Sequence, residues 1–409
     1  MGKSSEFRNF IWNLIGTTIN AFMSLVYQVI VTRVNGLEAT GIFSVCFSFS
    51  LIVYTFTNLG GRVYEVADLK GDDSTYYTLK WFTGGISIAF SLAFSWLCGY
   101  EREKTMLIML LMLVRIVESF SDTVYAVWQK AERLDLVGIS YVLKNIISVA
   151  TFTILNVITG NMMVATGTML IATVAVYFLF DLRILKGFYH IQWNTSMRAC
   201  AILVRQLLYF IGYNIVIMVI ANLPKLIADQ KYTDSQVGYL GILMMIPTVM
   251  LLMGQLLIQQ NLTKITKQYH FGNFSTVKRI IGRMFVRIAL LATICCIGAY
   301  LLGVPVLNLI YGLDFWAYKN MMILLIIAGM FNVFVTILSA VLTVMEKTNQ
   351  QLQLYLIVMV LEAVSMSFGL SGESAWRIFL IYAFVMLVQF CIFQLYFNIT
   401  MRGLYGKLG

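Results

Sequence analysis

Long apolar runs recur along the whole chain, and they constrain its fold more than any other feature of the sequence. Twelve runs, bounded by charged residues or glycine, approach the roughly 20 residues that a transmembrane helix needs. Only 12% of the 409 residues are charged, against about 25% in soluble domains, so no soluble catalytic domain fits between the runs. We therefore expect an all-α membrane protein of about 12 transmembrane helices. We place them at residues 10–32, 39–60, 78–98, 105–127, 137–158, 162–182, 203–227, 236–258, 284–302, 321–345, 351–370 and 376–398.

Lysine and arginine residues outside these segments fall mostly on one side of the membrane. With both termini on the same side, the loops and segment ends there hold 20 Lys and Arg residues, against seven on the other side. Because basic residues collect in cytoplasmic loops, both termini are predicted to be cytoplasmic. This bias also accounts for the net charge of +10, so nucleic acid is not expected as a partner.

One large basic loop, residues 183–202, divides the predicted segments into six and six. A weak repeat supports this division, because residues 38–43 and 235–240 each combine a polar start with a glycine and an aromatic residue at the opening of a segment. We expect an N-terminal six-helix bundle (1–182), a cytoplasmic linker (183–202) and a C-terminal six-helix bundle (203–409). Two pseudo-symmetric bundles around a central cavity are a frequent plan among transporters.

Patterns that would indicate catalysis or cofactor binding are missing from the sequence. Gly2-Lys3-Ser4 lacks the upstream glycine of a phosphate loop, His190 and His270 are isolated, and the six cysteines have no zinc or redox spacing. We therefore expect no enzymatic activity, no cofactor and no metal site. With no ATP site, uphill transport must be coupled to an ion gradient or to the gradient of the substrate itself.

Polar side chains inside an apolar segment indicate a face that does not contact lipid. In the first segment they recur at spacings of three and four, within an arc of about 120°. Two asparagines and a glutamine on one face favour a water-filled cavity over the alternative, close helix packing through small residues. The residues predicted to line this cavity are Asn13, Thr17, Asn20, Ser24 and Gln28.

Three charged residues near the middle of the fourth segment give the strongest functional signal. Arg115, Glu118 and Asp122 share one face, and a charge at the bilayer centre costs about 2.5–3.5 kcal/mol. An ion pair between Arg115 and either acid leaves one acid unpaired, and a buried unpaired acid is a candidate proton relay. Glu118, Asp122 and Glu362 of the eleventh segment are the ion-coupling candidates. Glu362 either takes a proton or pairs with Lys144 or Arg115, and the sequence leaves this choice open.

Two further segments carry cations near their ends. Lys144 lies about two turns inside the fifth segment, and we favour an ammonium that extends back to the interface over one that faces the interior. Asn222 and Lys225 align on the seventh segment, where Pro224 breaks the helix. Counted over all candidate interior positions, cations outnumber carboxylates. Such a surplus suits an anionic cargo, for instance a phosphate or pyrophosphate head group.

Five stretches of the chain, in the same order and spacing, resemble those of one transporter group. They are residues 31–43 (VTRVNGLEATGIF), 58–66 (NLGGRVYEV), 128–138 (WQKAERLDLVG), 222–225 (NLPK, followed by Gly238-Tyr239) and 303–312 (GVPVLNLIYG). The group is the bacterial polysaccharide flippases of the multidrug/oligosaccharidyl-lipid/polysaccharide exporter superfamily. The resemblance covers most of the chain, and it depends on order and spacing more than on any single motif.

The resemblance implies two bundles that face each other across a central cavity in the bacterial plasma membrane. It implies an undecaprenyl-pyrophosphate-linked oligosaccharide as cargo, carried from the inner to the outer leaflet by alternating access for surface polysaccharide biosynthesis. Membrane lipids and a polysaccharide polymerase or glycosyltransferases of the pathway are the implied partners. By position it adds Arg33, Arg62 and Lys225 to the site. The substrate-binding candidates are then Arg33, Arg62, Arg115, Lys144, Asn222 and Lys225.

Three other functions compete with this hypothesis. A multidrug and toxin extrusion-type ion-coupled antiporter has the same fold, although a surplus of basic residues disfavours cationic drugs. A membrane-embedded polymerase or transferase needs catalytic residues on a large outer loop, and the longest one, 303–320, offers only Asp314 and Lys319. A structural scaffold would leave the charged interior unexplained.

Overall fold

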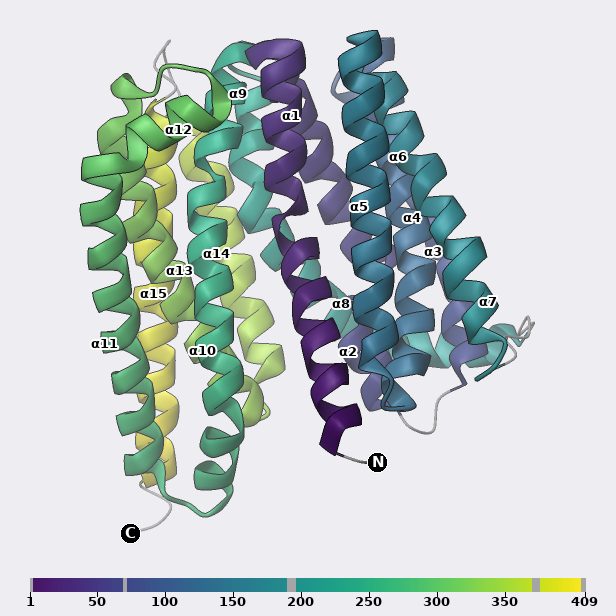
Figure 1. Ribbon diagram of the computed structural model, residues 1–409. Coiled ribbons are helices and arrows are strands. Elements are labelled where there is room, and N and C mark those ends of the chain that lie inside the picture. Colours follow the sequence, from purple (N-terminus) through teal and green to yellow (C-terminus); the bar gives the residue numbers. More distant parts are fainter. Residues whose placement is uncertain (1–2, 69–71, 190–195, 370–375, 406–409) are drawn as a thin grey trace. The chain divides into compact units, whose positions relative to one another are not determined.

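The computed structural model describes residues 3–68, 72–189, 196–369 and 376–405, and these residues form helices and no β-strand (Figure 1). Nine stretches within these ranges are helical, long and apolar enough to cross a membrane, so the chain is a multi-pass integral membrane protein. Each of the twelve predicted segments lies mostly on helical residues, and residue 370 lies outside the described residues. The number of twelve crossings stays a prediction, because α3 and α4 are not among the nine stretches.

The chain forms two compact units, Met1–Met218 and Val219–Gly409, and their boundary falls inside helix α8. Unit 1 contains α1 (Lys3–Thr57), α2 (Arg62–Ala67), α3 (Asp73–Leu97), α4 (Arg102–Lys130), α5 (Leu134–Thr159), α6 (Met162–Val176), the π-helix η1 (Tyr177–Asp181), α7 (Leu182–Leu185) and the first part of α8 (Met197–Asp229). Unit 2 contains the rest of α8, α9 (Asp234–Leu243), α10 (Met245–His270), α11 (Phe274–Gly298), the π-helix η2 (Ala299–Gly303), α12 (Val304–Tyr311), the 3₁₀-helix η3 (Trp316–Tyr318), α13 (Lys319–Val344), α14 (Thr348–Gly369) and α15 (Trp376–Tyr405).

The first part of α8 belongs to unit 1 because of its apolar side chains. Leu203, Leu207 and Ile211 repeat every four residues, so they lie on one side of the helix. They form one buried cluster with Tyr76 and Leu79 of α3. The predicted division at 183–202, with residues 203 onward in the C-terminal bundle, stays a prediction, since compactness alone places the boundary further along the chain.

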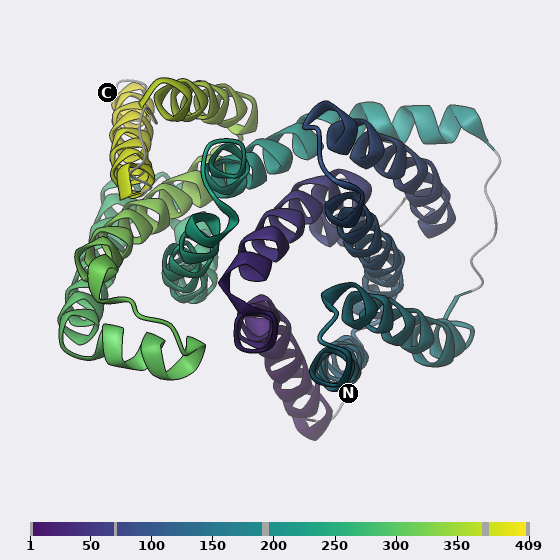
Figure 2. The ribbon, with the colours of Figure 1, turned by 90° about the horizontal axis from the view of Figure 1, so that it is seen from above.

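Helix α1 consists of two arms that meet at Gly36. This residue has φ 90° and ψ −177°, a backbone conformation that glycine adopts far more readily than other residues because it has no Cβ atom. Across the turn, the Thr40 hydroxyl donates to Thr32 Oγ1 at 2.9 Å. Figure 2 shows the turn as a short purple link between the two arms. The arms correspond to the predicted segments 10–32 and 39–60.

The first arm follows α5 from end to end. Near its start, the Asn9 amide donates to the carbonyl of Glu132, just before α5, at 2.8 Å. Near its end, the Asn35 amide donates to the carbonyl of Gly160, just after α5, at 2.9 Å. The loops of unit 1 therefore alternate between two ends, as the segment assignment predicts, while the choice of the cytoplasmic end stays a prediction.

The second arm follows α4 instead. Cys46 Sγ lies 3.9 Å from the carbonyl oxygen of Lys104 at the beginning of α4. Further along, the side-chain amide of Asn58, just after α1, contacts Asp122. Since α4 and α5 are consecutive helices separated by three residues, the two arms run in opposite directions and enclose a space together with both helices.

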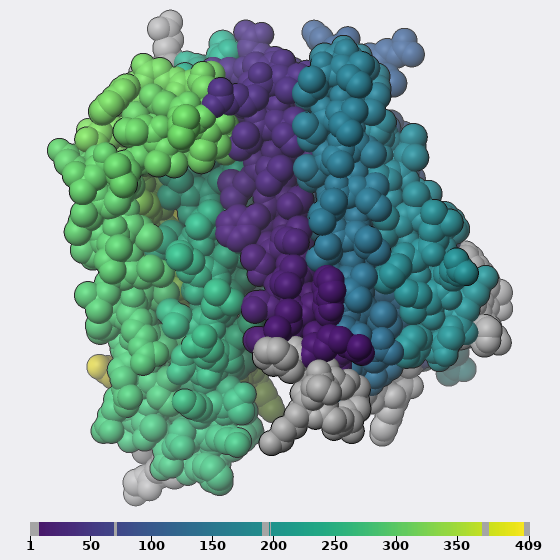
Figure 3. Space-filling view, viewed as in Figure 1, coloured from purple at the N-terminus to yellow at the C-terminus, as the bar shows by residue number. Residues whose placement is uncertain are grey.

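The first arm and α5 approach closely at Gly16 and Gly138. A Cβ atom on Gly138 would overlap the carbonyl group of Trp12, and a Cβ atom on Gly16 would overlap the backbone of Gly138. Figure 3 shows the purple arm and the blue α5 side by side at the surface of unit 1. Small residues permit this close approach between membrane helices. One part of the polar face of the first arm therefore serves helix packing.

We expect Gly138→Ala to lower the free energy of unfolding by about 1–3 kcal/mol, because the two helices must move apart to accommodate the methyl group. The measurement is reversible unfolding of the purified protein in detergent. Gly167→Ala on α6 is the matched control, since nothing lies within 4 Å of a Cβ atom there. Equal stability of the two variants would show that the helices do not cross this closely.

Candidate functional site

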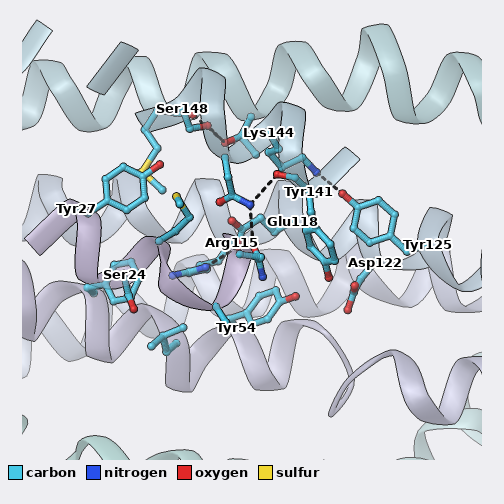
Figure 4. A pocket seen from close by; sticks show the side chains of 18 residues that line it. Ser24, Tyr27, Tyr54, Arg115, Glu118, Asp122, Tyr125, Tyr141, Lys144 and Ser148 are labelled. Carbon is cyan, nitrogen blue, oxygen red and sulfur yellow. Dashed lines mark hydrogen bonds and ion pairs between the residues drawn. The ribbon is translucent and has the colours of Figure 1, made fainter. Parts of the chain in front are cut away.

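A cavity of about 260 Å³ lies inside unit 1, among the two arms of α1 and helices α4, α5 and α6 (Figure 4). Many of the side chains that line it, near the middle of these helices, are polar or aromatic. Its ionisable and polar residues are Arg115, Glu118, Asp122, Lys144, Tyr27, Tyr54, Tyr125, Tyr141, Asn20, Ser24, Asn145, Ser148 and Thr173. Such side chains are costly against lipid, so they indicate a hydrated interior.

Arg115 pairs with Glu118, one of the two acids that the sequence left open. Arg115 Nη1 lies 2.6 Å from Glu118 Oε2, one turn away on α4. The guanidinium group also lies over the rings of Phe47 and Tyr54, at 4.7 and 5.8 Å from the ring centres. Arginine has five N–H donors, and the hydrogen bond to Glu118 uses one of them. The pair is partly open to the cavity, with 12% and 24% of the two side chains exposed.

The other acid, Asp122, also has partners. This corrects the expectation that one acid of the fourth segment is left unpaired. Its Oδ2 accepts a hydrogen bond from Asn58 Nδ2 at 2.6 Å, and its Oδ1 lies 3.9 Å from Arg62 Nη1. Arg62 also lies 5.8 Å from the ring centre of Tyr125. Both partners come from beyond the end of α1, so spacing along α4 could not reveal them. A role of Asp122 in ion coupling stays a prediction.

Lys144 does not extend to the interface, contrary to the interpretation favoured from sequence. Its side chain is buried, and its Nζ donates to Ser121 Oγ at 2.6 Å, Tyr125 Oη at 3.0 Å and Asp181 Oδ2 at 3.2 Å. Asp181 is completely buried and also accepts a hydrogen bond from Ser140 at 2.6 Å. A carboxylate and two hydroxyl groups thus replace the water that the ammonium would otherwise seek.

Two buried groups of this region escaped the sequence analysis. Asp181 is the single charged residue of the predicted segment 162–182, and the need of Lys144 for a counter-ion was a signal that could have found it. Lys80, which the orientation count placed with the cytoplasmic loops, is buried on α3. Its Nζ lies 3.3 Å from Glu65 Oε2 and 3.0 Å from the carbonyl oxygen of Ser119. This pair joins α2 to α3, so only the tertiary structure reveals it.

Charges balance in and around the unit 1 cavity. Its cations and their partners are Arg62 with Asp122, Arg115 with Glu118 and Lys144 with Asp181. The surplus of cations expected for the interior is therefore not found in the described part of unit 1, because the sequence count omitted Asp181 and included Arg33, which is exposed and does not line the cavity. An anion that binds here must compete with a carboxylate for its cation.

Only part of the polar face of the first arm lines the unit 1 cavity. Asn20 and Ser24 line the cavity, whereas Asn13, Thr17 and Gln28 do not. The Thr17 hydroxyl donates to the carbonyl of Asn13 at 2.6 Å. Gln28 is buried, and its amide atoms make no hydrogen bond within the described residues.

The remaining candidates lie elsewhere in the chain. Arg33 is exposed near the end of the first arm of α1 and does not line the unit 1 cavity. Asn222, which is buried, and Lys225 belong to unit 2, on α8. Glu362 on α14 is completely buried in unit 2, and neither carboxylate oxygen has a hydrogen-bond partner among the described residues. Binding and coupling roles for these four residues stay predictions. The described residues hold no cluster of three or more His, Cys, Asp or Glu suited to a metal ion.

Solved structures of membrane transporters share this fold. An inward-facing multidrug resistance MATE family transporter of the MOP superfamily superposes with a TM-score of 0.74 and 11% identity, over 97% of this chain and 99% of that chain. The lipid II flippase MurJ, in an inward closed conformation, gives 0.70 and 13% identity over 94% and 86% of the two chains. A MOP superfamily transporter from Pyrococcus furiosus, described as having a binding pocket of reverse polarity, gives 0.54 and 12% identity over 98% and 96%. At these identities the likeness shows the fold.

Among curated proteins, the capsular polysaccharide biosynthesis protein CapF of Staphylococcus aureus is similar to part of the chain. The two are 23% identical over 185 residues, which is 45% of this chain and 46% of CapF. The match thus spans about half the length of CapF. No family model matches the chain. Together, the transporter fold and the match to CapF agree with the resemblance found in the sequence.

Proposed function

We propose that this chain, which has the fold of MATE family transporters and of the lipid II flippase MurJ, is itself a flippase. Its cargo is an undecaprenyl-pyrophosphate-linked oligosaccharide repeat unit for surface polysaccharide biosynthesis. It carries this cargo from the inner to the outer leaflet of the bacterial plasma membrane by alternating access. The shared fold and the partial similarity to CapF support this assignment.

The observation that carries the proposal is the set of ionised side chains around the unit 1 cavity. A lone charge at this depth costs about 2.5–3.5 kcal/mol, and simple packing would be served better by apolar residues. Arg115 presents N–H donors that its bond to Glu118 leaves unused. Guanidinium donors suit phosphate oxygens, and the phenol and amide groups of the lining suit sugar hydroxyls.

The size of the cavity limits what it holds. At about 260 Å³ it is smaller than the roughly 300–1,000 Å³ of sites that enclose a drug-sized ligand. It has room for a pyrophosphate group or a single sugar ring but not for a whole repeat unit. In this proposal the unit 1 cavity receives the head group, and the remainder of the cargo lies outside it.

In this proposal Glu118 couples the uptake of a proton to the binding of cargo. While it is ionised, Glu118 occupies Arg115 and competes with a cargo phosphate for the same donors. A proton on Glu118 removes this competition, so proton uptake favours cargo binding. Asp122 and Lys144, which have their own partners, keep the surrounding helices in place during the exchange. In this proposal Arg62 acts through Asp122.

The test is a reconstitution of the purified full-length protein in liposomes with a fluorescent polyprenyl-pyrophosphate-linked sugar. A membrane-impermeant quencher reports the fraction of label that reaches the opposite leaflet. We expect flipping to be faster than in protein-free liposomes. If the label crosses at the protein-free rate under imposed proton and sodium gradients, the flippase assignment fails.

A multidrug antiporter is the second candidate. The sequence count disfavoured it because a surplus of cations would repel cationic drugs, and the balanced charge around the unit 1 cavity removes that objection. A neutral set of ion pairs does not repel an organic cation as a basic chamber would. The same liposomes, loaded with a cationic dye, separate the two functions. Dye exchange driven by a proton or sodium gradient, without flipping of the lipid-linked sugar, assigns the chain to the antiporters.

Glu362→Gln tests the third coupling candidate. The amide keeps the shape of the buried side chain but cannot take up or release a proton, and it replaces a carboxyl group whose oxygens have no hydrogen-bond partner among the described residues. We expect transport under an imposed ion gradient to fall to the rate measured without a gradient. Glu346→Gln, at an exposed position of the same unit, is the control and keeps the response. An unchanged response in Glu362→Gln removes this residue from the coupling mechanism.

A further inference from the structure

A second cavity, of about 220 Å³, lies within unit 2 between the end of α10 and the beginning of α11. We call it the α10–α11 groove. Of the seven residues that line it, three are cations, Lys264, Arg283 and Arg287, and two are amides, Gln260 and Asn261. None is acidic. The composition of the groove therefore favours a negatively charged ligand.

One face of each helix builds the groove. Gln260 and Lys264 lie four residues apart on α10, and Arg283 and Arg287 lie four residues apart on α11, so each pair stacks one turn above the other. The helices pack together and are joined by the three residues 271–273. Two stripes of hydrogen-bond donors therefore line the same cavity.

The groove has no carboxylate to neutralise it. Residues 235–313 contain no Asp and no Glu, and Lys264, Arg283 and Arg287 form no ion pair within the described part of the chain. The cations around the unit 1 cavity, by contrast, each have an acidic partner. Like charges four residues apart on a helix repel by about 0.2–0.5 kcal/mol, so a bound anion would relieve the repulsion between Arg283 and Arg287.

The donor set is typical of a phosphate site. Two arginines offer paired N–H donors that match phosphate oxygens, and lysine adds a mobile positive charge. The side-chain amide of Gln260 adds a neutral donor. With about 30 Å³ for each water molecule, the 220 Å³ of the groove hold a phosphate group together with its ester substituents and several waters.

The groove lies where an apolar surface ends. On α11, Val286, Leu290 and Ile294 are 59%, 59% and 66% exposed, starting beside Arg287. On α10, the apolar sequence ends at Ile258, and residues 259–261 are Gln-Gln-Asn. In Figure 3 the side chains of α11, in green, form part of the visible surface of unit 2. Unpaired cations at the edge of an apolar belt are typical of the boundary between hydrocarbon and lipid head groups.

We propose that the α10–α11 groove binds the phosphate group of an anionic phospholipid, such as phosphatidylglycerol. The lipid belongs to the leaflet on the side predicted to be cytoplasmic. Arg283 and Arg287 bind the phosphate oxygens, Lys264 supplies further charge, and Gln260 bonds the glycerol part. The bound lipid neutralises the positive charge of the α10–α11 groove and holds α10 against α11. This inference rests on unit 2 alone and does not depend on the transported cargo.

The test uses full-length protein purified in a neutral detergent, with lipid binding followed by native mass spectrometry. The ligands are phosphatidylglycerol, the zwitterionic phosphatidylethanolamine, inorganic pyrophosphate and farnesyl pyrophosphate. We expect Arg283→Gln/Arg287→Gln to weaken phosphatidylglycerol binding about tenfold or more, because both bidentate donors are lost. The matched control, Lys267→Gln/Arg279→Gln, removes the same charge from the same two helices at exposed positions outside the groove lining. It should bind within about twofold of the wild type, because these two side chains lie one turn outside the groove lining and face solvent, where water and salt screen their charges.

Three outcomes would overturn the inference. Equal weakening in the control variant would mean that diffuse surface charge attracts the lipid. Competition by inorganic pyrophosphate or farnesyl pyrophosphate at lower concentrations than phosphatidylglycerol would assign the groove to free phosphate or to a prenyl-linked cargo. Equal binding of phosphatidylethanolamine would remove the role of charge. The three cations are exposed, so the variants should fold, and the single variant Lys264→Gln provides a second, milder measurement.

Discussion

Arg115→Ala is expected to reduce flipping of a polyprenyl-pyrophosphate-linked sugar by about tenfold to hundredfold. A hydrogen bond to a charged group contributes about 1.5–3 kcal/mol, and each 1.4 kcal/mol corresponds to about a factor of ten. The variant also leaves Glu118 in the cavity without the cation that it contacts at 2.6 Å, so an anionic head group would meet a negative charge instead of a positive one. The measurement is the liposome assay with the fluorescent lipid-linked sugar.

Arg102→Ala is the control, because Arg102 is exposed in the first turn of the same helix and does not line the unit 1 cavity. Arg115→Lys keeps the charge but loses the planar pair of donors, so it should recover only part of the rate.

Asp122→Ala should also impair flipping, by releasing Arg62 and Asn58. Normal flipping by Arg115→Ala and by Asp122→Ala, with normal membrane insertion, would remove this cavity from the transport route.

Asp181→Ala is expected to lower the free energy of unfolding by about 3–5 kcal/mol, the usual cost of removing one partner of a buried ion pair. Lys144 would keep its charge in the interior, with only Ser121 and Tyr125 left to solvate it. Ser140 would lose the acceptor that it contacts at 2.6 Å. The measurement is denaturant unfolding in detergent micelles, followed by intrinsic fluorescence.

The double variant Lys144→Met/Asp181→Leu separates an ion pair from simple packing. Replacing both partners by apolar residues leaves no unpaired buried charge, so it should recover most of the stability that Asp181→Ala loses. Additive losses in Lys144→Met, Asp181→Leu and the double variant would show that Lys144 and Asp181 do not interact. Asp314→Ala, on the connection before η3 in unit 2, serves as a control for loss of an acidic residue.

The helices were predictable from the sequence because the membrane imposes a local rule on every segment. In hydrocarbon, each backbone N–H and C=O must be bonded within its own helix, so a long apolar run has little alternative to helix. The predicted segment 137–158, for example, lies within α5, from Leu134 to Thr159. The turn at Gly36 falls between the first two predicted segments, where glycine follows Asn35.

The grouping of ionised residues was predictable only in part. Arg115, Glu118 and Asp122 share a helix, so periodicity along the chain was enough to place them on one face. Partners on other helices gave no such signal. Asp122 accepts a hydrogen bond from Asn58, which is 64 residues away along the chain. Lys144 donates one to Asp181, which is 37 residues away.

The sequence by itself determined that this chain spans the membrane as a set of helices and that charged side chains occupy their middle. Both follow from the cost of exposing polar groups to lipid, which each segment meets separately. Only the tertiary structure decided which charges neutralise one another, that Asp122 and Lys144 have partners, and that the cations of the α10–α11 groove have none. Pairing depends on side chains within a few ångströms of each other in space, and their distance along the chain places no limit on it.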